Sequence, residues 1–178
     1  MYLTIVAISL GLAYWLLLWA LPKVFALPAG PFRFRSLLAI IFFSVGSYLI
    51  SFQFTSVDWE NRFLHVFGGG FAAVLVVFLA CRDAKLPLKR SQFITLAVLL
   101  ATTFGTINEL LEFTLQRYTP LTFAESTDDT WLDLVSNTVG IILACLALFP
   151  ASNFDARKLT TTNDHHKDDH RREEGEAA

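Results

Sequence analysis

Residues 64–80, LHVFGGGFAAVLVVFLA, form an apolar run in which only His65 carries a polar side chain. As a helix rising 1.5 Å per residue, this run would cross most of a hydrocarbon core that is roughly 30 Å thick. The whole chain of 178 residues is 54% hydrophobic and only 17% charged, and its mean hydropathy is +0.50. A soluble domain of this size does not need so much apolar material. The sequence therefore predicts an integral membrane protein.

Four further runs are long enough and apolar enough to cross a bilayer as helices. With the first run, the predicted spans are residues 2–21, 37–54, 64–80, 93–115 and 131–149. We expect an all-α fold, a polytopic membrane helix bundle of about five transmembrane helices that forms one domain over residues 1–150. Residues 151–178 have few apolar side chains to offset the entropy of ordering, so we predict a disordered cytoplasmic tail there.

Lysine and arginine are distributed unevenly among the loops between these spans. The loops after the first and third spans are rich in basic residues, whereas the other two loops hold Arg62 and Arg117 among a larger number of acids. Because basic loops stay on the cytoplasmic side, we predict an N-out, C-in topology. Nine basic residues balance nine acidic ones before residue 151, and the tail carries the net charge of -2. The expected partner is the lipid bilayer, and no feature indicates nucleic acid binding.

Ionisable residues gather near the predicted outer ends of the last three spans. Counting from each span centre places four of them roughly 7 to 13 Å from the midplane on the same side. These four are His65, Glu109, Glu112 and Asp133. Glu109 and Glu112 lie three residues apart and therefore share one helix face. Three predicted helices thus bring ionisable groups to one depth.

A second polar stripe runs along the last predicted span. Asp129, Asp133 and Asn137 step by four residues and lie on one face of that helix. A carboxylate that faces lipid at this depth is costly, so we expect both stripes to turn toward a shared cavity that opens outward. Arg62 is expected to attract a phosphate or to pair with one of the neighbouring acids Asp58, Glu60 and Glu125.

Three short motifs resemble those of a known family. NRFLHVF, residues 61–67, resembles the Asp/Asn-Lys/Arg-x-x-His element that opens a membrane helix in the VanZ-like family. ELLEF at 109–113 and DLVSNTVG at 133–140 are similar to the remaining motifs of that family, and they occur in the same order. Asn61 replaces the more usual acid, and Glu112 stands where glutamine is more common. The second departure is shared with YjdF-like inner-membrane proteins.

This resemblance covers about 85 residues, from Asn61 to Ala144. It implies a multi-pass protein of a bacterial-type plasma membrane with a role at the cell envelope. Some VanZ-like proteins are linked to glycopeptide-antibiotic tolerance, but the biochemical activity of the family is not established. The chemistry must therefore be argued from the residues.

One interpretation of the polar cluster is a metal-dependent enzyme that acts on a lipid head group or a cell-envelope precursor. One imidazole with several carboxylates suits a divalent ion, which could activate water or polarise a phosphoryl oxygen. The expected metal ligands are His65, Glu109, Glu112 and Asp133. Glu112 could instead act as a general base, while Asp129 and Asn137 would orient the ligands.

Two other interpretations remain open at this point. In the first, the same groups form a structural hydrogen-bond network in a non-catalytic, envelope-accessory binding protein. In the second, Glu109 and Glu112 share protons in a proton- or ion-coupled transporter. The predicted spans show neither an internal repeat nor a helix broken at the midplane, which counts against a transporter. Stoichiometric metal would separate the enzyme from the structural network.

Overall fold

The computed structural model of the protein describes residues 2–28, 30–119 and 127–154, and every regular element in these ranges is helical. Five helical stretches are long and apolar enough to cross a membrane. They are Val6–Val24, Phe34–Ser51, Val57–Asp83, Arg90–Tyr118 and Asp128–Ala151. This confirms the prediction of an all-α bundle with five spans. The N-out, C-in orientation stays a prediction.

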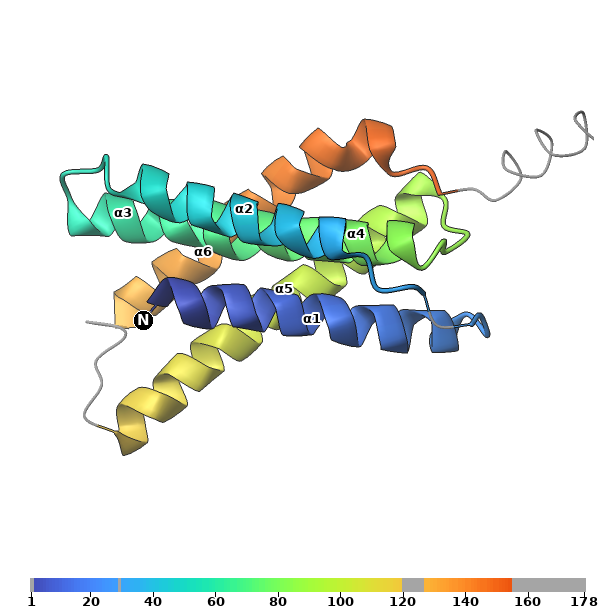
Figure 1. Ribbon diagram of the computed structural model, residues 1–178. Coiled ribbons are helices and arrows are strands. Elements are labelled where there is room, and N and C mark those ends of the chain that lie inside the picture. The colour runs from blue at the N-terminus through green and yellow to red at the C-terminus, as the bar shows by residue number, and fades with distance from the viewer. Residues whose placement is uncertain (1, 29, 120–126, 155–178) are drawn as a thin grey trace, which may run out of the picture.

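Helices α1 (Tyr2–Val24) and α2 (Phe34–Ser51) form the first two spans. The third span is continuous but changes its winding, from α3 (Val57–Phe63) through η1 (Leu64–Phe71) to α4 (Ala72–Asp83). Helices α5 (Arg90–Tyr118) and α6 (Thr127–Leu148) follow, and the short η2 (Phe149–Ala151) extends α6. In Figure 1, α1, α2 and the third span run alongside one another, while α5 and α6 cross them at a slant.

The third span is the centre of the bundle. Of its most apolar window 56% is buried, against 17% to 33% for the other four spans. Val74, Val76 and Val77 of α4 are fully buried, and α4 packs against α1, α5 and α6. Since the other spans cover this helix on several sides, polar side chains on it can meet partners from all of them.

The helix that contains the third span begins before the predicted membrane run of residues 64–80. It starts at Val57 rather than at Leu64, so the polar residues Asn61 and Arg62 lie within the helix. Both side chains are partly buried and find carboxylate partners on α6. Because a helix can extend beyond the hydrocarbon core, the predicted span of residues 64–80 stays a prediction.

The central segment of the third span, η1, is a π-helix. The amide of Ala72 donates to the carbonyl of Phe67, five residues earlier, instead of to the residue four earlier. This wider winding is rare and occurs frequently at functional sites. It lies between the helix α3 and the buried helix α4, and it carries His65.

The two ends of the bundle can be named by the acids and the histidine that they hold. The His65 end contains the start of α3, the end of α5 and the start of α6, and the Asp83 end contains the ends of α1 and α4. At the Asp83 end, α1 and α4 both stop at a residue in the left-handed conformation, Ala26 and Lys85. The following amides, of Leu27 and Leu86, each donate to a carbonyl five residues back, which satisfies the helix end.

The predicted tail begins with packed residues. Phe154 lies against the rings of Phe78 and Phe93, and its amide donates to the carbonyl of Leu88. Ser152 is fully buried. The packed domain therefore continues to residue 154, and the rest of the predicted tail, residues 155–178, lies outside the described residues.

Candidate functional site

Three ionisable side chains meet at the His65 end of the bundle. His65 of η1, Glu109 of α5 and Asp133 of α6 each offer one ligand atom, and these atoms all lie within 4.8 Å of one another. None of the three residues is more than 7% exposed. The sequence prediction that these three spans bring polar groups to one level is thus confirmed for these residues. We call them the His65 cluster.

His65 is held from both sides of its ring. The amide nitrogen of Asn137 lies 3.3 Å from Nδ1, and Oδ1 of Asp133 lies 3.2 Å from Nε2. Because the Asn137 amide nitrogen can only donate, Nδ1 accepts from it, and Nε2, near Asp133, carries the proton of the neutral ring. Asn137 therefore contacts the imidazole directly, while its predicted role in orienting a metal ligand stays a prediction.

Arg62 joins α3 to α6. Its guanidinium forms ion pairs with Asp129 and Asp133, and it also donates to the backbone carbonyl of Asp129 at 3.2 Å. Asn61 donates to Oδ1 of Asp133 at 3.1 Å. Among the described residues Arg62 pairs with neither Asp58 nor Glu60, so these two predicted partners were wrong, and the third, Glu125, lies outside the described residues. Arg62 faces α6.

In the described part of the chain, Glu109 lacks the hydrogen bonds and the ion pair that offset the burial of the Asp133 carboxylate. Its Oε1 is buried and has no hydrogen-bond partner among the described residues, and the nearest ring nitrogen, Nδ1 of His65, is 3.9 Å away. That nitrogen already accepts from Asn137. A buried carboxylate oxygen without a hydrogen-bond donor or a cation lowers the stability of the fold. A ligand that binds Glu109 would remove this cost.

Glu112 lies one turn beyond Glu109 on α5. Its carboxylate accepts a hydrogen bond from Asn108 at 2.7 Å, and it is more exposed than Glu109. It is not one of the three residues whose ligand atoms come together. Its predicted roles as a fourth ligand or a general base stay predictions.

The cluster forms because η1 and α6 approach unusually closely. A side-chain carbon added at Gly70 would collide with the backbone carbonyl of Asn137, and one added at Gly140 would collide with the carbonyl of Val66. Gly69 likewise leaves room for the Asn137 side chain. Small residues let helix backbones meet in this way. They set Asn137 against the turn that carries His65.

The structure also contains a second polar cluster that sequence analysis missed, at the Asp83 end. Asp83 is fully buried and accepts from the hydroxyls of Tyr14 at 2.7 Å and of Ser36. Arg82 and Arg33 place guanidinium nitrogens 3.2 and 3.6 Å from its other oxygen. This cluster ties α1, α2 and α4 together. The only feature of the sequence that could have indicated this cluster is Asp83 itself, a single acid within a segment rich in basic residues.

Residues 2–153 match the family described as "Predicted membrane protein (DUF2238)". The chain belongs to this family. Comparisons with curated proteins and with solved structures found no match. The DUF2238 match covers all five helical spans, so it agrees with a multi-pass membrane protein embedded in a lipid bilayer.

Membership of the DUF2238 family supplies no activity. It therefore leaves the function to be argued from the His65 cluster. No match bears on the resemblance to VanZ-like and YjdF-like proteins, and that resemblance stays a prediction. The same holds for the cell envelope as the setting of this DUF2238 protein.

Proposed function

We propose that this DUF2238 protein binds one divalent metal ion between His65, Glu109 and Asp133. The observation that supports this most strongly is the buried Oε1 of Glu109, which has no hydrogen-bond partner among the described residues. It lies beside an imidazole and a second carboxylate, the donor types that zinc and manganese accept. A cation among them would offset the cost of the uncompensated carboxylate.

The spacing of the donor atoms fits one ion after small movements. Nε2 of His65 and Oδ1 of Asp133 are 3.2 Å apart. Two ligands of a tetrahedral zinc ion, with bonds near 2.1 Å, are about 3.4 Å apart. The ion would replace the proton on Nε2, and the proton of the neutral imidazole would then lie on Nδ1. The side-chain amide of Asn137 would turn so that its oxygen accepts from this N–H, which is the usual arrangement for a ligating histidine. Three protein ligands leave a position for water or substrate.

The chemistry that suits such a site is hydrolysis near the membrane surface. A bound divalent ion would activate water or polarise a phosphoryl oxygen. Because the cluster lies near one end of the bundle, the proposed substrate is a lipid head group or a cell-envelope precursor. With the topology predicted from the loop charges, the site would face the extracytoplasmic side. Glu112, one turn from Glu109, is the proposed general base.

A structural network is the second candidate function, and Arg62 favours it. Its guanidinium pairs with both Asp129 and Asp133, and Asn61 adds a third contact between α3 and α6. These bonds join two spans without any metal. Glu109 takes no part in them, which separates the two candidates experimentally.

The deciding measurement is the metal content of detergent-purified full-length protein by plasma mass spectrometry. We expect about one divalent ion per chain in the wild type and a loss of that ion in His65→Ala and in Glu109→Gln. Asp58→Asn, which also removes a carboxylate at the His65 end but at an exposed position, is the matched control. The tail histidines His165, His166 and His170 contribute equally to every variant, so only the differences count.

A wild type that is free of metal, although it was purified without chelators, would refute the metal site. If Arg62→Ala then unfolds the protein while Glu109→Gln does not, the structural network is supported instead. Metal that is retained in both site variants would assign the ion to another part of the chain.

A further inference from the structure

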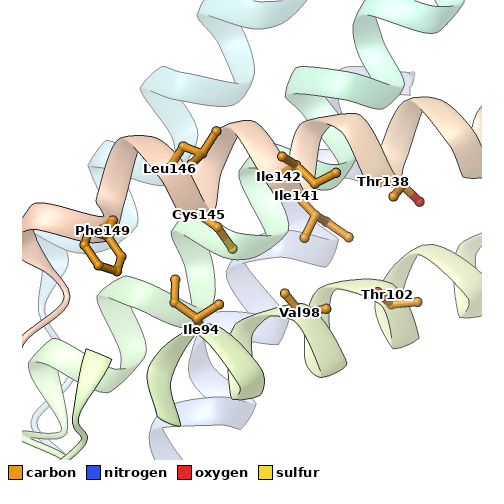
Figure 2. A pocket seen from close by; sticks show the side chains of 9 residues that line it. All are labelled: Ile94, Val98, Thr102, Thr138, Ile141, Ile142, Cys145, Leu146 and Phe149. Carbon is orange, nitrogen blue, oxygen red and sulfur yellow. The ribbon is translucent and has the colours of Figure 1, made fainter. Parts of the chain in front are cut away.

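A groove of about 360 Å³ lies between α5 and α6 (Figure 2). On α5 its wall is formed by Ile94, Val98 and Thr102, which step by four residues and therefore share a face. On α6 the facing wall includes Ile142, Leu146 and Phe149. The lining side chains are almost entirely apolar, so the groove suits a hydrocarbon ligand.

A cationic side chain lies at the Asp83 end of this groove. Arg90, one turn before Ile94 on the same face of α5, is exposed, and its Cζ lies 5.2 Å from the ring centroid of Phe149. Its guanidinium also donates to the carbonyl of Pro150 at 3.5 Å. These contacts hold Arg90 where the apolar lining ends, and most of its donors stay available for an anion.

We propose that the groove binds one acyl chain of an anionic phospholipid whose phosphate contacts Arg90. The distance along α5 from Arg90 to Thr102 is about 18 Å, close to the roughly 15 Å depth of one leaflet. The hydroxyl of Thr138, near the deep end, donates to the carbonyl of Leu134 in its own helix and does not require a polar ligand. The groove is apolar along its length, which suits an acyl chain, and has a cationic side chain at one end, which suits the phosphate of a phospholipid.

The volume favours a lipid over a protein segment. An α-helix is about 10 Å across, so 18 Å of helix occupies on the order of 1,400 Å³, several times the volume of the groove. An acyl chain is much thinner. The proposal is independent of the metal site, because none of the groove residues belongs to the His65 cluster.

The test is native mass spectrometry of the full-length protein with phosphatidylglycerol or phosphatidylcholine of identical acyl chains. We expect one phosphatidylglycerol to be retained per chain, with about fivefold preference over phosphatidylcholine, the effect of one basic residue near an anionic lipid. Arg90→Gln should remove the preference, and Val98→Phe, which fills the groove, should reduce retention of both lipids.

Two substitutions serve as matched controls. Arg35→Gln removes a basic residue at the same end of the bundle, and Leu99→Phe enlarges an exposed side chain next to Val98 but outside the groove. Both should retain lipid as the wild type does. If the wild type retains the two lipids equally, and Arg90→Gln does not change this, the proposal is overturned. A dimer that Val98→Phe separates would also overturn it, because the groove would then be an interface between copies.

Discussion

Asp83 and Glu109 are both buried carboxylates, but their surroundings differ. Asp83 accepts two hydroxyl hydrogen bonds and faces two guanidinium groups. Glu109 leaves one oxygen without a partner among the described residues. A compensated carboxylate can join helices, whereas an uncompensated one is a cost that a ligand can remove. The two residues therefore respond differently to the same change, a carboxylate replaced by an amide.

Glu109→Gln should change stability in opposite directions with and without metal. In chelated protein we expect the free energy of unfolding to rise by about 1–3 kcal/mol, because a neutral amide replaces an unpaired carboxylate. With zinc present, the variant should unfold at a lower temperature than the wild type, since it has lost a ligand. Thermal unfolding in detergent, with chelator and with zinc, measures both. An effect of the same sign in both conditions would contradict the metal site.

Asp83→Asn should destabilise the protein whether or not metal is present. The amide oxygen can keep both hydroxyl donors, but an amide nitrogen would replace the oxygen that faces Arg33 and Arg82, so we expect a loss of about 1–3 kcal/mol. The midpoint of thermal unfolding reports this loss. Asp58→Asn, at an exposed position, should leave the midpoint unchanged. An unchanged midpoint in Asp83→Asn would show that the Asp83 cluster does not hold α1, α2 and α4 together.

At the scale of helices, the contact between η1 and α6 positions the His65 cluster. Gly70 and Gly140 each lie against a backbone carbonyl of the other element, so the two backbones are in contact. The π-helical winding of η1 shifts the direction of every side chain that precedes it relative to an α-helix. His65 reaches Asp133 and Asn137 through this combination of winding and close approach.

Gly70→Ala should disrupt this contact, and Gly68→Ala should not. The methyl group at residue 70 has no space, and overpacking of this kind costs about 1–3 kcal/mol. At residue 68 nothing lies within 4 Å of the added carbon, and alanine favours a helix more than glycine does. The midpoint temperature of thermal unfolding and the metal content should both fall in Gly70→Ala and should not fall in Gly68→Ala. Equal behaviour of the two variants would show that the glycine contact does not position the site.

The sequence predicts depth along each helix better than direction around it. Because every residue adds a fixed rise, counting residues is enough to place His65, Glu109 and Asp133 at one level. The partners of Arg62 could not be found in this way, because the start of α3 and the winding of η1 decide which way Arg62 points. The Asp83 cluster could not be predicted for the same reason, because its contacts depend on which faces of α1 and α2 meet α4.

At the scale of the whole molecule, two polar clusters lie at opposite ends of an apolar bundle, and both use the third span. His65 lies near the start of that span, and Asp83 is its last residue. The central helix is therefore joined to its neighbours by polar contacts toward both of its ends, while its middle packs through apolar side chains. A fixed orientation in the bilayer follows, and it can be tested.

We expect the His65 end to face the outside of the cell. A cysteine in place of Asp58 should react with a membrane-impermeant maleimide added to intact cells, whereas a cysteine in place of Arg35 should react only after the cells are opened. Both positions are exposed. Parallel labelling of the unsubstituted protein controls for Cys81 and Cys145, which are not exposed. The opposite pattern would place the metal site on the cytoplasmic side.

The position of α6 in the chain has a consequence for biosynthesis. Of the five described spans, α6 is the latest to leave the ribosome, and it supplies Asp129, Asp133 and Asn137 to groups that are already in the bilayer. Before it arrives, α1, α2 and α4 can already be joined through Asp83, but Arg62 and His65 lack these partners. A nascent chain interrupted after α5 would expose polar groups to lipid, which marks it for degradation. Insertion of α6 thus gives Arg62 and His65 their partners and distinguishes chains that contain this span from chains interrupted before it.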